Sequence, residues 1–360
     1  MKASHSPFLS FSPATAVALF AVLITSGFTC SAPAQPGRPQ NTNAQFRTDE
    51  QVRVHDPSNL VRDGETFWTF STGTGIRSLY SSNLVQWQFS APALTPATTP
   101  AWHQRAVPGH RGHLWAPDVI QVDGRWLLYY SVSTWGKNTS AIGLLTNATL
   151  NPADPRFGWR DAGVVIASMA TNNYNTIDPA VFRDVDGRLW LSFGSFWSGL
   201  KLVELDPKTG LRLAPDSPLH SLAHKDKIEA PFLHRRDTNY FLFLNWGQCC
   251  QGTNSTYEIR VGRAERITGP YRDRDGVELL SGGGTLVLNS SGRFIGPGHA
   301  GIIQVGNTEW FSFHYYDSEN RGRATLGLRK LTWDTEGWPV VTESTPGGPM
   351  QITLPANASH

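Results

Sequence analysis

Three acidic residues lie at spacings that suggest catalysis. Asp56 and Asp178 each precede a proline, and Glu229 stands two residues before one. Each begins a stretch in which a short apolar run leads through a turn to an aromatic-rich run. Cleavage of a glycosidic bond needs one protonated carboxyl group, which releases the leaving oxygen, and one ionised carboxyl group. A third carboxyl nearby helps to keep the acid protonated. These residues therefore predict glycoside hydrolysis.

The stretches that carry these acids belong to a repeat. Each copy opens with a polar or ionisable residue and Pro or Ala, then continues as a short apolar strand, a turn at an Asp-Gly-like step and an aromatic-rich strand, which is the pattern of a β-hairpin. Such restarts at a long period indicate a repeat architecture. The five copies are residues 55–71, 115–131, 177–194, 228–245 and 298–314.

Further strand-like segments lie between the repeats, at residues 142–146, 200–205 and 259–264. Each unit therefore holds about four strands, and no window shows a convincing amphipathic helix with caps. Frequent turns agree with the 34 Gly and 24 Pro among 360 residues. Four-stranded units repeated around an axis predict an all-β fold, a five-bladed β-propeller. A generic β-sandwich, the alternative, does not explain five restarts.

The innermost strand of each propeller blade lines the central axis, so the first residues of the repeats converge at one end of it. Trp115 would offer an aromatic face for sugar stacking, and His299 lies in a glycine-rich backbone that can approach a ligand or an ion. Counting back from each hairpin turn places five residues at this position: Asp56, Trp115, Asp178, Glu229 and His299.

Two structural interpretations compete with catalytic roles. An isolated Asp-Pro is mostly a turn, as at residues 206–207, and only their places in the repeat favour Asp56 and Asp178 as functional residues. Asp118 lies three residues beyond Trp115, an odd offset that turns a side chain to the other face of a strand. We therefore expect a structural role for Asp118.

The N-terminus predicts secretion, to the extracellular space or the periplasm. An apolar run at residues 14–27 follows a basic start and precedes Ala-Pro-Ala at residues 32–34, the pattern of a cleaved signal peptide over residues 1–34. An uncleaved anchor is the alternative. Residues 35–47 are polar and predict a flexible segment, and residues 48–355 then form a single propeller catalytic domain.

Charge and cysteine content narrow the possible partners. With 31 Lys and Arg against 29 Asp and Glu, the chain lacks the basic excess of a nucleic-acid binder. After removal of the signal, two adjacent cysteines remain, Cys249 and Cys250. They form either a vicinal disulfide in an oxidising compartment or two small buried side chains. We expect a monomer with no membrane contact once the signal is cleaved.

The motifs together resemble a known family. From about residue 52 to residue 331, the chain is similar to the arabinan-degrading enzymes of glycoside hydrolase family 43, most closely to the endo-1,5-α-L-arabinanases. Any one of the motifs is weak evidence, but seven in the same order are strong. They lie at residues 54–57, 113–119, 129–134, 177–179, 193–199, 228–231 and 296–299.

The resemblance implies a five-bladed propeller, cleavage with inversion, and plant cell-wall arabinan or arabino-oligosaccharides as substrate. It implies Asp56 as general base, Glu229 as general acid, and Asp178 as the residue that orients substrate and raises the acid's pKa. It also implies one calcium ion in the central channel, beside His299 and largely coordinated by water. The implied substrate-binding residues are Asp56, Trp115, Gly136, Asn175, Asp178, Ser195, Phe196 and Trp197.

Two other functions stay open. The run at residues 88–111, rich in Pro, Thr and His, would rim the cleft and could close one end of it. The enzyme would then be an exo-acting α-L-arabinofuranosidase or a β-xylosidase of the same family. A non-catalytic sugar-binding propeller would keep Trp115 and Trp197 but tolerate the loss of an acid, whereas this chain has all three acids.

Overall fold

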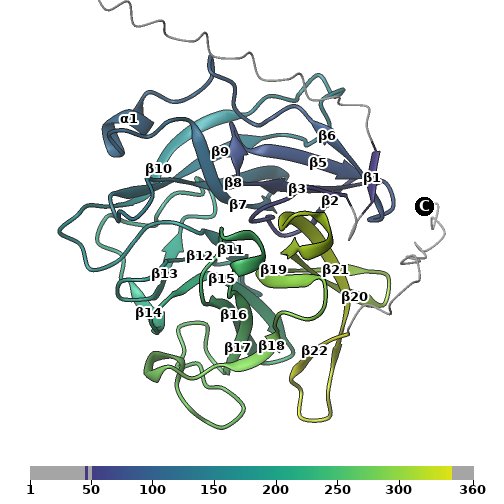
Figure 1. The fold of residues 1–360 in the computed structure, drawn as a ribbon. Coiled ribbons are helices and arrows are strands. Elements are labelled where there is room, and N and C mark those ends of the chain that lie inside the picture. The colour runs from purple at the N-terminus through teal and green to yellow at the C-terminus, as the bar shows by residue number, and fades with distance from the viewer. Residues whose placement is uncertain (1–44, 48–50, 343–360) are drawn as a thin grey trace, which may run out of the picture. The chain divides into compact units, whose positions relative to one another are not determined.

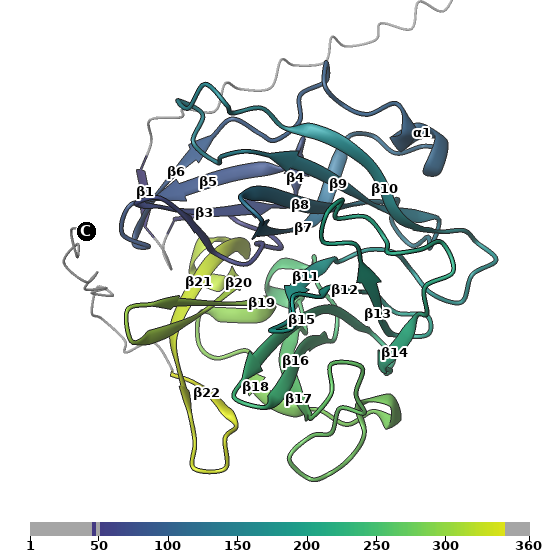
Figure 2. The same ribbon diagram turned by 180° about the vertical axis from the view of Figure 1, so that it is seen from behind.

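The computed structural model describes residues 45–47 and 51–342. The chain divides into two compact units, residues 1–39 and residues 40–360, and only the second contains described residues. The expected signal peptide lies outside the described residues. Figure 1 shows that the second unit is built from successive sheets arranged in a ring, and Figure 2 shows the same ring from behind.

Five antiparallel sheets make up the ring, and each is one blade. Blade 1 contains β2 (Val61–Asp63), β3 (Thr66–Ser71), β5 (Arg77–Ser81), β6 (Gln86–Ser90) and, at its outer edge, β1 (Gln45–Arg47). Blade 2 contains β7 (His113–Val122), β8 (Arg125–Val132), β9 (Ser140–Asn147) and β10 (Arg160–Ser168), with β4 (Gly73–Thr74) paired to β7. The prediction of a five-bladed β-propeller is confirmed.

The other three blades have four strands each. Blade 3 contains β11 (Ala180–Arg183), β12 (Leu189–Phe193), β13 (Leu200–Leu205) and β14 (His220–Ala223). Blade 4 contains β15 (Ile228–Arg236), β16 (Asn239–Trp246), β17 (Glu258–Ala264) and β18 (Thr285–Leu288). Blade 5 contains β19 (Phe294–Val305), β20 (Thr308–Asp317), β21 (Arg323–Trp333) and β22 (Pro339–Val341). The strand-like segments expected between the repeats fall in β9, β13 and β17.

Hairpin turns and aromatic strands explain why the repeats form blades. Between β7 and β8 the chain turns through Asp123 and Gly124, both with positive φ (49° and 77°), a turn whose twist matches that of the paired strands. The second strand of a hairpin is mostly buried. In β8, every residue from Trp126 to Val132 is buried.

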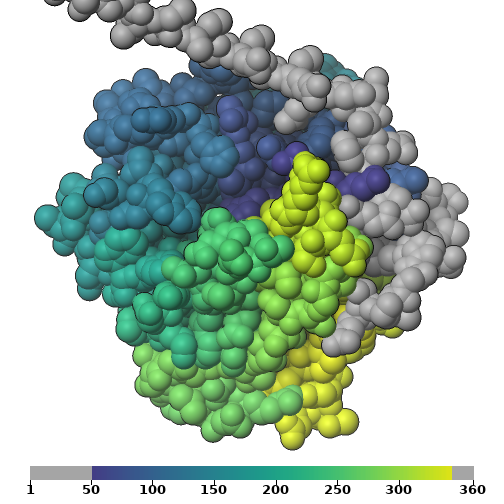
Figure 3. Space-filling view, in the orientation of Figure 1, coloured from purple at the N-terminus to yellow at the C-terminus, as the bar shows by residue number. Residues whose placement is uncertain are grey.

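Apolar side chains pack between neighbouring blades. Five clusters of buried residues fill the five junctions, for example Trp68 of blade 1 with Leu128 of blade 2. Each fully buried large side chain stabilises the fold by about 1.5–3 kcal/mol. Because every blade contributes to two clusters, the ring folds as one body, and the blade colours follow it in chain order in Figure 3.

Backbone hydrogen bonds close the ring where the first and last blades meet. The N–H of Val54 donates to the carbonyl of Ala324 at 3.2 Å, and the N–H of Leu326 donates to the carbonyl of Val52 at 2.8 Å. The segment that leads into the first repeat is therefore held by β21. This contact places His55 and Asp56 against blade 5.

Some details differ from the sequence-based expectations. The run at residues 88–111 contains a short helix, α1 (Trp102–Ala106), that packs on blade 2, where the Trp102 indole faces Asp161 at 3.2 Å. Short 3₁₀ turns lie at Gly252–Asn254, Leu279–Ser281 and Ser318–Asn320. Residues 45–47, the end of the expected flexible segment, form β1. Among the described residues, no helix has the length and apolar character to cross a membrane.

Candidate active site

One residue in each blade has the same unusual backbone conformation at the start of the inner strand. These residues have left-handed φ angles between 40° and 58° and are Asp56, Ala116, Asp178, Ala230 and His299. Counting from the turns had placed Trp115 and Glu229 at this position, and that register was wrong by one residue in blades 2 and 4. Both side chains instead lie one residue earlier, at the position that His55 occupies in blade 1.

The error comes from hairpins of different lengths. Blades 2 and 4 turn through two residues, whereas blade 3 turns through the five residues 184–188. The inner strands also carry bulges, between Trp115 and Asp118 and between Glu229 and Phe232. A bulge places two residues opposite one and re-aims a side chain. In blade 4 the bulge turns the side chain of Glu229, the residue before Ala230, toward the site.

Each residue at the shared position is tied to the preceding blade. In four blades its backbone N–H donates to a side chain at the end of that blade's second strand. The second strand of blade 3 ends at Phe193 and is followed by Gly194, which offers no side chain, and the backbone N–H of Ala230 in blade 4 instead lies near the Asp178 carboxylate and lowers its pKa. The acceptor side chains are His314, Thr72, Ser131 and Asn245.

Asp56 is buried among groups that stabilise its charge. Its Oδ2 lies 2.7 Å from His55 Nδ1 and accepts the Thr72 hydroxyl at 2.5 Å, and its Oδ1 lies 3.0 Å from His299 Nε2. Burial alone would raise the pKa of Asp56, but the histidines outweigh it and hold that pKa well below its usual range. Asp56 is therefore an ionised carboxylate at neutral pH.

Three imidazoles surround this carboxylate in different states. Burial lowers the pKa of His55, but the charge of Asp56 more than compensates and the net shift is upward. Burial lowers the pKa of His299 and, much further, that of His314, so both are neutral at neutral pH. His314 Nδ1 accepts the Asp56 N–H at 3.1 Å, which identifies this nitrogen as unprotonated.

Glu229 is equally buried but has few partners. The Ser195 hydroxyl donates to its Oε2 at 2.6 Å. Burial and the charge of Asp56 raise the pKa of Glu229 to about 7, against the opposing effect of the Ser195 hydrogen bond. Glu229 therefore keeps a proton near neutral pH while Asp56 is ionised. Protonated and ionised carboxyl groups in one site are what glycoside hydrolysis requires.

Asp178 lies in the same buried group of acids. Burial, then the charges of Glu229 and Asp56, raise its pKa well above the usual value. The three acids are thus electrostatically coupled, as expected of groups gathered at one end of the axis. The neighbouring charge that raises the pKa of Glu229 is that of Asp56.

Asp118 lines the channel but acts between blades. One carboxylate oxygen accepts the backbone N–H of Asn59 in blade 1 at 3.0 Å, and the other accepts that of Val181 in blade 3 at 2.8 Å. Burial raises its pKa to about 6. The expected structural role of Asp118 agrees with these contacts.

The expected substrate-binding residues lie at different depths. Ser195 is buried against Glu229, and Asn175 is buried with its Oδ1 accepting the Ser140 hydroxyl at 2.7 Å. Trp115 and Phe196 are half-buried, and Gly136 is exposed. Of these residues, Ser195 is in direct contact with one of the acids, Glu229.

Two tryptophans project from the rim. Trp197 of blade 3 is 42% exposed, and Trp135, in the loop after β8, is 74% exposed. Trp135 lies edge-on to Trp115, with ring centroids 6.4 Å apart. Sequence analysis did not single out Trp135, although it directly follows the recognised motif at residues 129–134 and directly precedes Gly136.

His299 provides little of a calcium site. Its Nε2 faces the Asp56 carboxylate at 3.0 Å. Calcium prefers six to eight oxygen ligands. Among the described residues, the groups of three or more possible metal ligands are His55 with Cys249 and Cys250, and His55 with Asp56 and His314, so neither includes His299. The protein residues described do not form a calcium cage.

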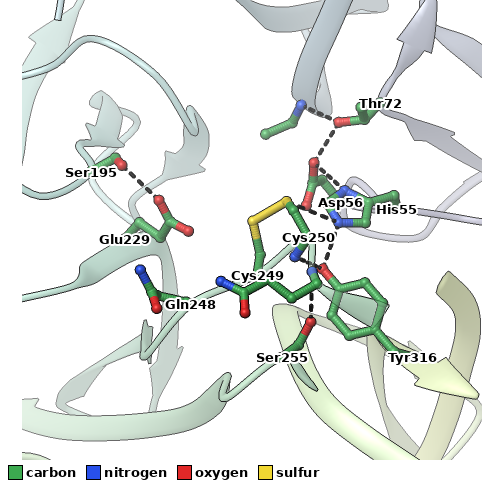
Figure 4. Close-up of a disulfide and its surroundings, with 12 residues drawn as sticks. His55, Asp56, Thr72, Ser195, Glu229, Gln248, Cys249, Cys250, Ser255 and Tyr316 are labelled. Atoms are coloured by element: carbon green, nitrogen blue, oxygen red, sulfur yellow. Dashed lines mark hydrogen bonds and ion pairs between the residues drawn. A yellow bond between two sulfur atoms is a disulfide. The ribbon is translucent and has the colours of Figure 1, made fainter. Parts of the chain in front are cut away.

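Cys249 and Cys250 form a disulfide, with an S–S distance of 2.14 Å. This settles the alternative that the sequence left open. Figure 4 shows the disulfide between Glu229 on one side and the pair His55 and Asp56 on the other. The loop that carries it leaves blade 4 after β16 and reaches Tyr316 of blade 5.

Comparison with known proteins agrees with this geometry. The model of the family "Glycosyl hydrolases family 43" matches residues 50–339, which include all five blades apart from β1 and the end of β22. The chain belongs to glycoside hydrolase family 43. It is therefore a glycoside hydrolase.

Individual family 43 relatives are similar over most of their length. The extracellular exo-α-(1→5)-L-arabinofuranosidase ArbA of Cellvibrio japonicus is 42% identical over 308 residues, covering 82% of this chain and 88% of the relative. The extracellular endo-α-(1→5)-L-arabinanase 1 of Bacillus subtilis is 38% identical over 346 residues, covering 94% and 98%. A structure of Cellvibrio cellulosa α-L-arabinanase complexed with arabinohexaose is 42% identical, with a TM-score of 0.77, covering 81% and 96%.

Some residues of this family 43 site were missed by sequence analysis. His55, Thr72 and His314 contact Asp56, and Tyr316 contacts His55, yet only His55 stood in a recognised motif. Thr72 and His314 lie at or next to the end of a repeat, where the second strand reaches the axis. A polar residue recurring at the end of an otherwise apolar strand was the signal that could have found them.

Proposed function

We propose that this family 43 enzyme is secreted and cleaves internal α-1,5-L-arabinofuranosidic bonds of arabinan with inversion of configuration. The observation that carries the proposal is the pair of buried carboxyl groups with opposite pKa shifts, Asp56 downward and Glu229 upward to about 7. The arabinan specificity is supported by the relatives, whose names include both an endo-arabinanase and an exo-arabinofuranosidase.

In this proposal Asp56 is the general base. Its charge is stabilised by His55, His299 and Thr72, so it is ionised at neutral pH before the reaction, and it becomes a neutral carboxyl group when it takes the proton of the attacking water. The water attacks the anomeric carbon from the face opposite the leaving group. Inverting enzymes hold base and acid about 6.5–9.5 Å apart to leave room for that water.

Glu229 is the general acid. The Ser195 hydroxyl occupies Oε2, which leaves Oε1 to carry the proton toward the leaving oxygen. Because its pKa is raised to about 7, a large share of Glu229 is protonated when Asp56 is ionised. Asp178, whose pKa is also raised by burial, orients the sugar through the sugar's hydroxyl groups.

Exposed aromatic side chains support a polymeric substrate. Trp115 and Trp135 on blade 2 and Trp197 on blade 3 present flat faces at more than one place on the rim. Aromatic faces pack against the apolar faces of sugar rings, with part of the gain coming from buried apolar area. Several such places suit a chain of sugars better than a single residue.

Early product analysis tests the reaction. The purified enzyme is incubated with debranched arabinan, and proton NMR follows the anomeric signals before mutarotation. We expect the first new reducing ends to be β-anomers, because inversion converts the α-linkage. New α-anomers would contradict inversion, and release from xylan but not arabinan would support the β-xylosidase alternative. No release from either polymer would support a non-catalytic sugar-binding propeller.

Secretion is proposed from the signal-like N-terminus and from two relatives that are named extracellular. The disulfide between Cys249 and Cys250 is consistent with an oxidising compartment. Fractionation of the producing cells tests it. We expect the enzyme outside the cytoplasm with a new N-terminus near residue 35, and full-length enzyme in the cytoplasm would contradict the proposal.

The channel calcium ion also remains a proposal. His299 would face it through ordered water, since the described residues offer no cage, and the mechanism above has no step through the ion. Metal analysis of the purified enzyme tests it. We expect one equivalent of calcium that dialysis against EDTA removes, and enzyme purified without any bound calcium would contradict it.

A further inference from the structure

The Cys249–Cys250 disulfide is joined to the base by a continuous hydrogen-bond chain. The backbone N–H of Cys250 donates to Tyr316 Oη at 2.7 Å, and that oxygen lies 2.8 Å from His55 Nε2. His55 Nδ1 lies 2.7 Å from Asp56 Oδ2. Figure 4 shows these links in one line from the disulfide to the carboxylate. The chain crosses from blade 4 through blade 5 to blade 1.

The donor and acceptor roles in this chain follow from the groups themselves. The ionised carboxylate of Asp56 only accepts, so His55 Nδ1 carries a hydrogen. Whether Nε2 of His55 then accepts from the Tyr316 hydroxyl or donates to it, the Tyr316 oxygen has a lone pair for the N–H of Cys250. The anchor at Cys250 therefore serves both protonation states of His55.

The disulfide keeps this N–H in place. Cys250 has a φ of 70°, in the left-handed region that is unfavourable for a non-glycine residue. A bond between adjacent cysteines closes a small ring with their backbone and restricts its rotation. Without that ring, Cys250 is free to leave the left-handed region and to turn its N–H away from Tyr316.

We infer that the Cys249–Cys250 disulfide and Tyr316 are positioning elements for the general base, acting on Asp56 through His55. The inference rests on the proposed function, because it assigns Asp56 the base's task. Tyr316 is buried and contacts His55. The disulfide also contacts His55, with Cys250 Sγ 3.7 Å from His55 Nε2. A loosened His55 leaves Asp56 less well aimed at the attacking water, and this lowers turnover.

Reduction of the folded enzyme is the first experiment. Dithiothreitol supplies two electrons and two protons, so the S–S bond breaks into two thiols and dithiothreitol closes to its own cyclic disulfide. Mass spectrometry of the peptide that holds Cys249 and Cys250 confirms reduction. On linear arabinan we expect kcat to fall about tenfold with KM changed less than twofold, because positioning the base affects turnover rather than binding.

Two variants test whether the fall in kcat is transmitted through the hydrogen bonds from Cys250 to Tyr316, His55 and Asp56. Tyr316→Phe removes one hydroxyl and is expected to lower kcat about tenfold and to make the enzyme insensitive to dithiothreitol, since the chain is already broken. The double variant Cys249→Ala/Cys250→Ala should match the reduced wild type and also ignore dithiothreitol. Tyr271→Phe is the matched control, because its hydroxyl bonds the carbonyl of Ile267 at 2.8 Å, in the blade 4 core.

The outcomes separate this inference from the proposed function. Oxidised wild type that leaves arabinan intact contradicts the proposed function. Active enzyme that keeps its kcat after complete reduction contradicts the positioning role alone. So does a reduced Tyr316→Phe enzyme that loses a further tenfold. A rise in KM without a fall in kcat would assign the disulfide to substrate contact instead. Circular dichroism of each variant confirms that the propeller is folded.

Discussion

Asp56 and Glu229 share one buried site but prefer opposite charges. Burial disfavours ionisation of both, so the difference comes from their partners. Asp56 has the imidazoles of His55 and His299 and the hydroxyl of Thr72 around its two oxygens, whereas Glu229 has the single hydroxyl of Ser195. The site thus holds a base and an acid ready at the same pH without any conformational change.

The pH profile should report this asymmetry. Glu229 must be protonated, and its pKa is raised to about 7, so we expect kcat/KM to fall as the pH rises through about 7. Asp56 must be ionised, and its lowered pKa moves the acidic limb below the usual carboxylate range. Measured rates on arabinan between pH 3 and 9 check both limbs. An alkaline limb near pH 5 would contradict the assignment of Glu229.

The activity lost on removing the general acid should be restored by a substrate with a better leaving group. Glu229→Gln keeps the size of the side chain but cannot donate the proton, so we expect kcat on arabinan to fall about 10²–10⁴-fold. A nitrophenyl glycoside of α-1,5-arabinotriose has a leaving group that needs no proton. On it, the variant should keep most of the wild-type rate.

Asp56→Asn is the matched comparison for that variant. Without a base, attack by water is slow whatever the leaving group, so both substrates should lose activity together. Near-normal turnover of arabinan by either variant would contradict the proposed roles. Equal losses on both substrates for Glu229→Gln would assign that residue to binding rather than to proton donation.

The supporting residues show where prediction from sequence stops. Asp56, Asp178 and Glu229 could be found because their types and their places in the repeat both suggested catalysis. His314 and Tyr316 lie some 260 residues away from His55 and Asp56 along the chain. They meet only because the ring closes, and no local pattern encodes that contact.

At the scale of the inner strands, Asp118 should matter for stability. Its carboxylate is the acceptor for two buried N–H groups in different blades, and each one left unpaired costs about 1–3 kcal/mol. We therefore expect Asp118→Ala to lower the free energy of unfolding by about 3 kcal/mol. Urea unfolding measures it. Asp275→Ala, at an exposed loop position, is the control and should change little; equal effects would contradict the role of Asp118.

The same carboxyl makes stability depend on pH. Burial raises the folded-state pKa of Asp118 to about 6, above its ordinary value of 3.8. The unfolded chain then releases this proton first, so the contribution of Asp118 to stability is full below about pH 4 and declines as the pH rises to about 6. Asp118→Asn should lack this component when unfolding is measured at pH 4 and pH 6. An unchanged slope would contradict the raised pKa.

The repeat itself was predictable, but its register was not. Alternating apolar and aromatic runs with turn residues determine where hairpins form, and these were read correctly. The inner-strand bulges and the longer turn of blade 3 shift Ala116 and Ala230, rather than Trp115 and Glu229, into the shared position. Bulges depend on how strands pair in three dimensions, so residue counting misses them by one place.

At the scale of the molecule, the ring brings groups from several blades to one end. Base, orienting acid and general acid come from blades 1, 3 and 4, while exposed aromatic faces come from blades 2 and 3. The near-neutral charge, +2, leaves no strong field, as suits an uncharged polymer that is held by stacking and hydrogen bonds. The segment at residues 91–112 packs on blade 2 through Trp102 and His103.

The distribution of aromatic faces leads to the prediction on mode of action. Because Trp135 and Trp197 are exposed on two different blades, we expect a sugar chain to stack at more than one place and so to bind on both sides of the scissile bond. We expect debranched linear arabinan to give a ladder of short oligosaccharides from the first minutes, with viscosity falling faster than reducing ends appear. Anion-exchange chromatography of the time course checks this. A single product from the start would show exo action. In an endo enzyme, Trp135→Ala should shift the products toward other lengths. In an exo enzyme, the same substitution should leave the product pattern unchanged.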